Sequence, residues 1–435
     1  MTPDGGPPRI LTSRVDLAGS YTLKAFLETG GYEGLRKALS MKPDEVAQEV
    51  DEASLLGRGG AGFPAGRKWS MLRPADTTYL VVNGDESEPC TFKDHLLLET
   101  DPHQLVEGVA IAAYAIGVEQ AFIFIRGEMA LGLERVTQAV NEAYEYGALG
   151  RGILGSGFNL DVVVHPGAGA YICGEETGLL ESLEGKRGFP RIKPPYFPAA
   201  IGLYGEPTVV NNVETLSNMS WIVRNGGAAF AALGKGRSTG TRLFALSGRV
   251  KRPGVYEVEM AKTTFRDLIY GQEFGGGISG GKELKAFIPG GASAPWFGAD
   301  QVDMPLDQDE VGAAGTMLGS GSVVVMDETV CTVKVAWRIT RFFWRESCGQ
   351  CTPCREGGGW LEKILWRIEN GAGREEDVDM LADICDNISP GLHWPPEQTT
   401  ICPLGPSIPS PIASVMRMFE DEIRLHVKEG ACPLA

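Results

Sequence analysis

Short apolar runs alternate with longer segments of helical periodicity in the first half of this 435-residue chain. Three of the runs are rich in Val, Ile and Phe and are bounded by polar residues or glycine, as expected for buried strands. They lie at residues 79–83, 121–125 and 160–166. Apolar residues recur every three or four positions at 105–116 and 130–146, which predicts helices there. Alternating strands and helices indicate an α/β sheet covered by helices.

The segments on either side of this α/β region have other patterns. A polar leader comes before it, followed by predicted helices at 22–28 and 43–56 and then by a glycine-rich loop. A proline-rich link at 191–207 comes after it, followed by a predicted helix that includes 213–224. The α/β region is therefore extended by helices at both ends.

A change of pattern near residue 241 predicts a small α+β unit. It would consist of strands at 241–250, 253–260 and 285–291 and a short helix at 264–270. The final hundred residues have helical periodicity instead, interrupted by a cysteine-rich loop. We therefore predict four domains, at residues 1–65, 66–235, 236–325 and 326–435.

Charge and cysteine usage limit the class of protein. The net charge of −16 argues against a nucleic-acid partner, because such a partner is bound mainly through phosphate contacts. The nine cysteines do not have the spacing of a small disulfide framework, and the N-terminal residues lack an apolar signal core. The most apolar stretch, at 109–125, is too short to span a membrane and contains Glu119. These features predict reduced thiols, a cytoplasm-like compartment and no membrane insertion.

Three cysteines lie on one short loop. Cys348, Cys351 and Cys354 have the spacing C-x2-C-x2-C. A structural zinc site usually pairs its cysteines two and two, whereas the ferredoxin motif for an iron–sulfur cubane begins with this spacing. The loop therefore predicts a [4Fe–4S] cluster, which moves single electrons and needs a fourth ligand from elsewhere.

The fourth ligand has three candidates. Cys385 shares the apolar face of a predicted helix, which favours a buried core residue, and Cys432 lies close to the end of the chain, where chains fray. Cys402 is followed by proline, as in ferredoxin ligands, and we favour it. We interpret the remaining cysteines as structural: Cys90, Cys173 and Cys331.

The glycine-rich loop at 57–69 has the composition of a ligand-binding loop. It formally contains G-x-G-x-x-G from Gly57, but a helix rather than a strand is predicted before it, which weakens the dinucleotide interpretation. A P-loop is excluded because Gly66 is not followed directly by Lys and Ser or Thr. Bare backbone N–H groups beside Lys68 suit a phosphate or a flat ring, and the alternative is a glycine-rich surface turn.

Two acidic turns follow predicted strands. The first contains Asp85, Glu86 and Glu88, and the second contains Glu175 and Glu176. Ligands of open α/β sheets bind at the carboxyl ends of the strands, where carboxylates accept ribose hydroxyls and repel an extra 2′-phosphate. A single such turn is more typical of a solvated loop, but two of them together indicate a nucleotide site.

Amides and aromatic residues complete the candidate site. Asn211 and Asn212 can hydrogen-bond the uracil-like edge of a flavin. Phe63, Tyr171 and Phe197 can stack on rings, although each alone is more typical of a core residue.

Five motifs in order carry a family resemblance that covers nearly the whole chain. They are GRGGAGFPAGRKW, NGDESEP, GAGAYICGEETG, PTVVNNVETL and ESCGQCTPCREG. The chain resembles the FMN- and NADH-binding subunit of respiratory complex I. The same core occurs in the diaphorase subunits of NAD-reducing hydrogenases and NAD-linked formate dehydrogenases, which often carry extra domains that are not found here.

This resemblance implies a fold for each predicted domain. The N-terminal helical segment and its glycine-rich loop would lead into a Rossmann-like domain for FMN and NADH. The α+β unit would be a ubiquitin-like β-grasp domain. The C-terminal helices would form a bundle that carries the [4Fe–4S] cluster.

The resemblance also implies site residues. The FMN contacts would be Gly57, Gly59, Gly60, Lys68, Asn83, Asp85, Gly174, Asn211 and Asn212. NADH would stack on Phe63 and Phe197, surrounded by Glu88, Tyr171, Glu176 and Lys193. The cofactor site would also include Arg58, Gly62, Glu86 and Glu175. The cluster ligands would be Cys348, Cys351, Cys354 and Cys402.

The chain departs from the family pattern at a few positions. The usual KPPFPA is lengthened to KPPYFPA, so that either Tyr196 or Phe197 would face the nicotinamide. Met71 takes the place of a common aromatic residue, and Gly84 and Cys90 differ from the usual alanine and glycine. The segment before Cys402 is longer than usual, which leaves the register of this ligand open.

The resemblance implies an NADH:quinone oxidoreductase subunit without a catalytic acid or base. NADH would transfer hydride to FMN, and single electrons would then pass to the cluster and through the complex to quinone. Its partners would be other hydrophilic-arm subunits, especially a thioredoxin-like [2Fe–2S] subunit and a large multi-cluster subunit. The complex would hold it at the cytoplasmic face of the plasma membrane. The alternatives are a diaphorase subunit and, from another class, a non-catalytic iron–sulfur relay or assembly module.

Overall fold

A parallel four-stranded sheet organises the N-terminal half of the chain. Its strand order is β3-β2-β1-β4, and every neighbouring pair is parallel. The strands are β1 (Tyr79–Gly84), β2 (Gln120–Ile125), β3 (Asp161–Pro166) and β4 (Thr208–Asn212). The three predicted strands are confirmed. β4 was not predicted, because its apolar part is only two residues long.

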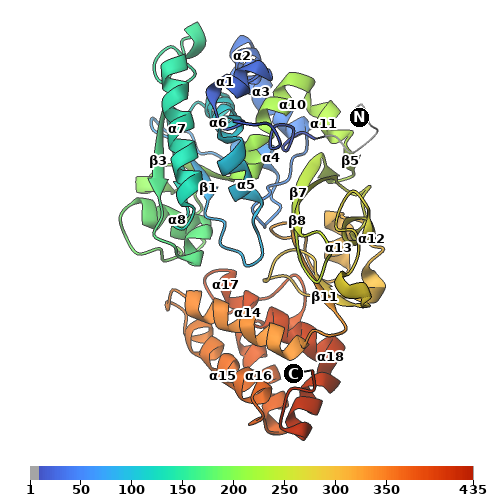
Figure 1. Ribbon diagram of the computed structural model, residues 1–435. Coiled ribbons are helices and arrows are strands. Elements are labelled where there is room, and N and C mark those ends of the chain that lie inside the picture. The colour runs from blue at the N-terminus through green and yellow to red at the C-terminus, as the bar shows by residue number, and fades with distance from the viewer. Residues whose placement is uncertain (1–8, 435) are drawn as a thin grey trace. The chain divides into compact units, whose positions relative to one another are not determined.

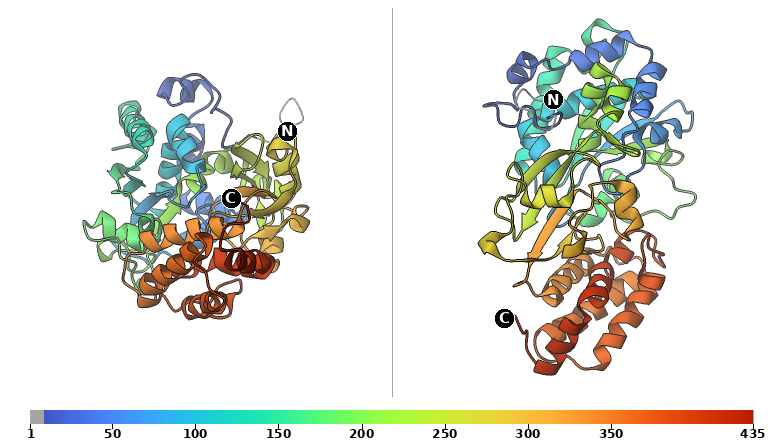
Figure 2. Two further views of the ribbon diagram at one scale, coloured as in Figure 1. Left: turned by 60° about the horizontal axis from the view of Figure 1, so that its bottom comes forward. Right: turned by 90° about the vertical axis from the view of Figure 1, so that its right-hand side faces the viewer.

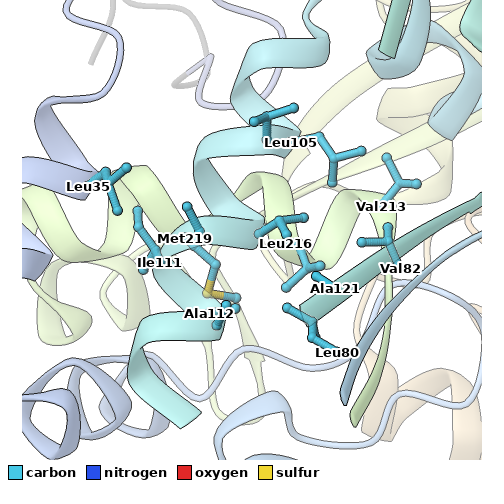
Figure 3. Packing of buried hydrophobic residues seen from close by; sticks show 14 of the residues in the cluster. Leu35, Leu80, Val82, Leu105, Ile111, Ala112, Ala121, Val213, Leu216 and Met219 are labelled. Carbon is cyan, nitrogen blue, oxygen red and sulfur yellow. The ribbon is translucent and has the colours of Figure 1, made fainter. Parts of the chain in front are cut away.

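One face of this sheet is covered by the long helix α6 (Pro102–Ile116). Alternate strand residues, such as Leu80 and Val82, are fully buried on this face and pack with Ile111 and Leu216 (Figure 3). Side chains alternate between the two faces of a strand, and Val81 on the other face is also fully buried, which accounts for the continuous apolar run in β1. α6 begins three residues before the predicted start.

The remaining helices of this half surround α6 and the sheet. α7 (Ala130–Tyr146) has the predicted bounds. The predicted helix at 43–56 ends as α3 at Glu52, because Ser54 takes a left-handed conformation and Leu56 pairs with Pro64. The other helices are α1 (Leu23–Glu28), α2 (Glu33–Ser40), α4 (Ala65–Ser70), α5 (Lys93–Thr100), α8 (Glu176–Leu183), α9 (Val213–Ser217), α10 (Met219–Asn225) and α11 (Gly227–Ala231).

A close helix contact in this core can be tested. At Gly108 of α6 an added Cβ would lie 2.0 Å from the Leu216 carbonyl oxygen. We expect Gly108→Ala to lower the free energy of unfolding by at least about 2 kcal/mol, because overpacked cores must shift backbone atoms. The same change at Gly312, in α13 (Gln308–Ala313), meets no atom within 4 Å and should be neutral or slightly stabilising. Calorimetry would compare the two variants, and an unchanged melting temperature for Gly108→Ala would contradict this packing.

A second sheet has five strands in the order β10-β9-β11-β7-β8. β11 is parallel to β7 and antiparallel to β9, which is antiparallel to β10. The predicted strands and the short helix between 241 and 291 are confirmed, whereas β10 and β11 were not predicted. The elements are β7 (Thr241–Gly248), β8 (Gly254–Glu259), α12 (Phe265–Tyr270), β9 (Leu284–Ile288), β10 (Phe297–Gly298) and β11 (Ser322–Asp327), and a two-residue hairpin is formed by β5 (Gly234–Lys235) and β6 (Ser238–Thr239).

The C-terminal segment is helical, as predicted. α14, α15, α16 and α18 pack against one another (Figures 1 and 2). Their bounds are α14 (Thr332–Glu346), α15 (Gly358–Glu369), α16 (Glu376–Ile388) and α18 (Ser410–Glu429), with the short α17 (Leu404–Ser407) before the last. Every helix in the described part of the chain is too short or too polar to cross a lipid bilayer.

The chain forms two compact units in this computed structural model, which describes residues 9–434. The first unit contains the parallel sheet and the residues up to 87, 92–244 and 255–263. The second contains 88–91, 245–254 and the residues from 264 onward. The predicted four-domain division stays a prediction.

Candidate functional site

The strand order of the first unit defines where a ligand can bind. β2 and β3 lie on one side of β1 and β4 lies on the other, so the order reverses between β1 and β4. Crevices at such reversals, outside the carboxyl ends of the strands, are where open α/β sheets bind ligands. Asn83 and Asn212 are register partners at these two ends. Two residues predicted from the motifs are therefore neighbours at the switch point.

The glycine-rich loop lies beside the end of β4. A Cβ at Gly59 would lie 3.1 Å from Cβ of Asn212. Gly60 has φ of +132°, which side-chain-bearing residues rarely adopt, and a Cβ there would meet no atom within 4 Å. The loop thus presents bare backbone and open space at the switch point, an arrangement that fits a flat ring or a phosphate.

Two lysines hold Glu176 between them. Lys68 Nζ lies 3.0 Å from Glu176 Oε2 and Lys193 Nζ lies 2.8 Å from Glu176 Oε1. Burial opposes ionisation of this carboxyl, but the attraction of Lys68 and Lys193 outweighs it and lowers the pKa of Glu176 to about 2. Lys68 also donates to the carbonyl of Val210 in β4, over 2.9 Å. Glu176 is therefore a fixed negative charge at neutral pH.

Glu175 orients the helix that follows. Its Oε2 accepts hydrogen bonds from the backbone N–H groups of Thr177 and Gly178, at 2.8 and 2.9 Å, and caps the N-terminus of α8. Its Oε1 accepts from Lys193 Nζ at 2.8 Å. One predicted site residue thus positions the turn that carries Glu176.

Asn83 connects β1 to this same turn. Its side-chain amide donates to the Gly174 carbonyl over 2.9 Å, and its side-chain oxygen accepts the backbone N–H of Asp85. A Cβ at Gly174 would lie 3.3 Å from Asp85 Oδ2. The ends of β1, β4 and the second acidic turn therefore converge.

A buried charged network supports the two strand ends. Asn212 donates to Asp94 Oδ2 over 2.5 Å, and Lys93 Nζ lies 2.8 Å from Asp94 Oδ1 and 2.7 Å from Glu214 Oε2. Trp69 donates from its indole to Asn211 Oδ1 over 3.0 Å. These supporting residues were not predicted from the sequence. A buried Lys-Asp pair at the start of a helix has the same local sequence pattern as a pair that is exposed to solvent.

Two other predicted residues are engaged by groups of the protein itself. Arg58 is buried, donates to the carbonyls of Thr239 and Thr241, and has its pKa lowered by burial to about 10. Glu86 accepts the first backbone N–H groups of α5, from residues 93–95. Burial, together with the charge of Asp94, raises the pKa of Glu86 to about 7.

Glu88 belongs to the second unit. There its carboxylate accepts the backbone N–H of Ser293 over 2.6 Å. The three acidic residues that follow β1 therefore have three different environments.

The aromatic candidates include exposed side chains. Phe63 and Phe197 are 39 % and 51 % exposed, and Tyr196 is 43 % exposed. Arg67 lies over the Phe63 ring at 5.9 Å from its centroid. Tyr171 is half-buried in the short turn that leads to Gly174. Exposed rings in these loops are available to stack on a planar ligand.

The cysteine loop of the second unit lies at the start of a helix. Ser347 Oγ is 3.2 Å from Cys354 Sγ, and Arg355 closes the loop by donating to the Gly349 carbonyl over 2.8 Å. Gly349 has φ of +84°, which a side chain would strain. Burial raises the pKa of Cys354 to about 11, so the free thiol is protonated at neutral pH.

Cys402 lies next to this loop. The backbone N–H of Ile401 donates to Cys351 Sγ over 3.3 Å, and Cys402 is buried. Cys385 is fully buried on α16 among apolar residues. Three thiols on one loop, with a fourth on the adjoining segment, form the donor set that a cubane requires.

Comparisons with known proteins match both regions. The family described as the Nuo51 FMN-binding domain matches residues 50–221. The NADH-ubiquinone oxidoreductase-F iron-sulfur binding region matches residues 334–426. The first match contains the glycine loop and both acidic turns, and the second contains all four proposed cluster cysteines.

Similar proteins include the F subunits of one enzyme, NADH-quinone oxidoreductase, in several bacteria. An F subunit of Rhizobium meliloti is 49 % identical over 98 % of this chain and 99 % of that protein. The F subunit of Mycobacterium bovis is 50 % identical over 93 % of this chain and 89 % of that protein, and that of Streptomyces coelicolor is 48 % identical over 98 % and 92 %. A crystal structure of NAD+-reducing [NiFe]-hydrogenase in the H2-reduced state superposes with a TM-score of 0.82 at 33 % identity, over 94 % of this chain and 66 % of that chain.

Proposed function

Because the chain belongs to the family of NADH-quinone oxidoreductase F subunits, we propose that its switch-point site binds FMN and NADH and that its cysteine loop holds the cluster. It is an oxidoreductase subunit with FMN and a [4Fe–4S] cluster as cofactors and NADH as substrate. FMN, when bound, accepts two electrons from NADH and releases them singly. The assignment of individual residues is our own inference.

The convergence of the glycine loop with the ends of β1 and β4 carries this proposal. Bare backbone at Gly59 and Gly60 admits a flat ring, and the amides of Asn83, Asn211 and Asn212 are held in place by protein partners. We propose that these residues, with Gly57, Gly62, Lys68, Asp85 and Gly174, hold FMN. Positioned donors of this kind orient a cofactor without taking part in its chemistry.

We propose that NADH binds over this cradle. Phe63 and either Phe197 or Tyr196 would stack on its rings, and Tyr171, Glu175, Glu176 and Lys193 would surround it. The exposure of these rings and the fixed charge of Glu176 support the assignment. For Glu88, the proposed contact with NADH rests on the family resemblance alone. Arg58 and Glu86 contribute through structure, since their charged groups are engaged by the protein.

The charge of Glu176 predicts coenzyme preference. We expect Glu176→Gln to raise kcat/KM with NADPH relative to NADH about tenfold, equivalent to 1.4 kcal/mol. The change removes a carboxylate that would repel the 2′-phosphate, and it releases Lys68 and Lys193 to attract that phosphate. Initial rates with an artificial electron acceptor would give the ratio.

Glu134→Gln is the matched control for this prediction. Glu134 is an exposed carboxylate on α7, so its replacement makes the same charge change on the surface. The ratio of the two coenzymes should not move in this variant. If Glu176→Gln also leaves the ratio unchanged, Glu176 does not face the ribose.

For the finer fold, we infer a Rossmann-like first domain, a β-grasp domain and a helical bundle with the cluster. The order β3-β2-β1-β4 is that of a mononucleotide-binding half with its next strand. The second sheet supports the β-grasp assignment. Its first and last strands along the chain, β7 and β11, are neighbours in the sheet and run parallel. The helix α12 lies in the chain between β8 and β9. The domain boundaries proposed for these parts are 66–235, 236–325 and 326–435.

Membership of the family implies other complex I subunits as partners. We propose in particular a thioredoxin-like [2Fe–2S] subunit and a large multi-cluster subunit, at the cytoplasmic face of the membrane. The likeness to the NAD+-reducing hydrogenase favours a second candidate, a diaphorase subunit with the same chemistry. The higher identity to the F subunits of NADH-quinone oxidoreductase, 48–50 % against 33 %, favours complex I. Co-purification of the chain with its neighbours would distinguish the two partners.

A further inference from the structure

A second group of metal-ligating side chains lies in the C-terminal unit, apart from the cluster loop. Cys331, Glu369, His426 and Cys432 each offer one ligand atom, and these four atoms lie within 4.8 Å of one another. Both cysteines are free thiols. We propose that these four residues form a structural zinc site that ties the C-terminal tail to the helices.

The distances among Cys331, Glu369 and His426 match those of a tetrahedral zinc site. Cys331 Sγ lies 3.3 Å from His426 Nε2 and 3.5 Å from Glu369 Oε2, and His426 Nε2 lies 3.4 Å from Glu369 Oε2. At about 2.3 Å (sulfur) and about 2.0–2.1 Å (nitrogen or oxygen) from tetrahedral zinc, two ligand atoms are about 3.3–3.6 Å apart when at least one is nitrogen or oxygen, and about 3.8 Å apart when both are sulfur. Three edges of the tetrahedron are therefore already formed by the protein.

The histidine has the orientation of a metal ligand. Its Nδ1 is 2.6 Å from the Glu422 carbonyl oxygen, which can only accept, so Nδ1 carries the proton. Nε2, the atom that faces the other three ligands, is then unprotonated and offers its lone pair. A carbonyl partner on the outer ring nitrogen is the usual support of a zinc-binding histidine.

The remaining contacts also favour a cation. The Cys331 thiol donates to Glu369 Oε2 over 3.5 Å, while the unprotonated Nε2 of His426 and the carboxylate face each other as acceptors, an arrangement that a divalent cation replacing the thiol proton would stabilise. The neighbouring ammonium group, Lys334 Nζ, lies 3.5 Å from the outer oxygen of Glu369, Oε1, while the backbone N–H of Lys334 donates to Cys331 Sγ over 3.3 Å. A backbone donor at a helix N-terminus favours the thiolate that zinc requires.

The four ligands come from four separated elements. Cys331 precedes α14, Glu369 ends α15, His426 is in the last turn of α18, and Cys432 is in the tail. The ends of α15 and α18 approach so closely that a Cβ at residue 371 would lie 2.1 Å from the carbonyl oxygen of residue 430. Four protein ligands leave no open position, which indicates a structural rather than a catalytic zinc. Binding would displace the two thiol protons to solvent.

Metal analysis of the purified full chain tests this site. We expect about one zinc per chain in addition to the cluster iron, and at least a tenfold lower zinc content in Cys432→Ser and in His426→Gln, because even supporting residues of zinc sites cost 10–100-fold in affinity. Iron content and the cluster EPR signal should be unchanged in both variants. Cys432 lies in the half-buried tail, so its replacement keeps the test valid if His426→Gln fails to fold.

Two matched cysteine variants separate this site from the cluster. Cys90→Ser, at an exposed cysteine, should keep its zinc. Cys348→Ser should lose cluster iron and keep its zinc, which excludes zinc captured by the cluster loop. Zinc far below one per chain after incubation with zinc chloride, equal zinc in Cys432→Ser and the wild type, or a Cys331–Cys432 disulfide in the mass spectrum would each overturn the proposal.

Discussion

Replacing Cys402 with serine is expected to remove the [4Fe–4S] EPR signal and to lower NADH-driven quinone reduction by at least about 100-fold. A cubane needs four thiolates. Loss of a residue that only supports a metal ligand lowers metal affinity or activity by about 10–100-fold, so loss of a ligand itself should lower activity by at least about 100-fold. The backbone N–H of Ile401 donates a hydrogen bond to Cys351 Sγ over 3.3 Å, which places the neighbouring Cys402 beside the cysteine loop and supports it as the fourth ligand. Iron content, low-temperature EPR and flavin content would be measured together. The flavin should be retained.

The matched control is the same substitution at Cys385. This cysteine was the core alternative for the fourth ligand, and it is fully buried on α16. Cys385→Ser should keep the cluster even if it lowers the melting temperature. A cluster that survives in Cys402→Ser but is lost in Cys385→Ser would show that the ligand assignment is wrong.

Replacing Gly59 with leucine is expected to lower the bound FMN at least about tenfold in a folded chain. The side chain would project from the glycine loop at the end of β4, where its Cβ would already lie 3.1 Å from Cβ of Asn212, a proposed FMN contact. A ligand excluded by a side chain loses the contacts of its planar ring, each tenfold being 1.4 kcal/mol of binding free energy. FMN released by denaturation would be quantified by fluorescence, and circular dichroism would establish the fold.

Gly157→Leu provides the control for this change. Gly157 is exposed in a loop of the same unit, and an added Cβ there meets no atom within 4 Å. FMN content should equal that of the wild type. Full FMN occupancy in Gly59→Leu would place the flavin elsewhere.

The elements with long, regular patterns could be predicted from the sequence. α7 has its predicted bounds because a 17-residue amphipathic segment is closed by Gly147 in a left-handed conformation. β4 and β11 were not predicted because their apolar cores are short and adjoin asparagine or glycine residues. The predicted helix at 213–224 is divided into α9 and α10 at Asn218, whose side-chain amide donates a hydrogen bond to the backbone carbonyl of Glu214.

The fold brings several of the predicted site residues together, but their contacts could not be predicted from the sequence. The acidic residues Asp85, Glu86 and Glu88 look equivalent in sequence. In the structure, however, Glu86 caps the N-terminus of α5 and Glu88 accepts a hydrogen bond from the backbone N–H of Ser293. Lys68 and Glu176 are 108 residues apart, and no local pattern pairs them. Cys331 and Cys432 looked like a core residue and a frayed end, and only the fold brings them together.

The central claim is that this chain itself passes electrons from NADH through FMN to the cluster. An anaerobic optical titration of the purified chain with NADH, followed by low-temperature EPR, tests it most directly. The account predicts that NADH bleaches the flavin absorbance and that the cubane signal appears on reduction. A chain that holds its cluster but shows no flavin bleaching with NADH, even after FMN is added, would contradict the account and favour a non-catalytic iron–sulfur module.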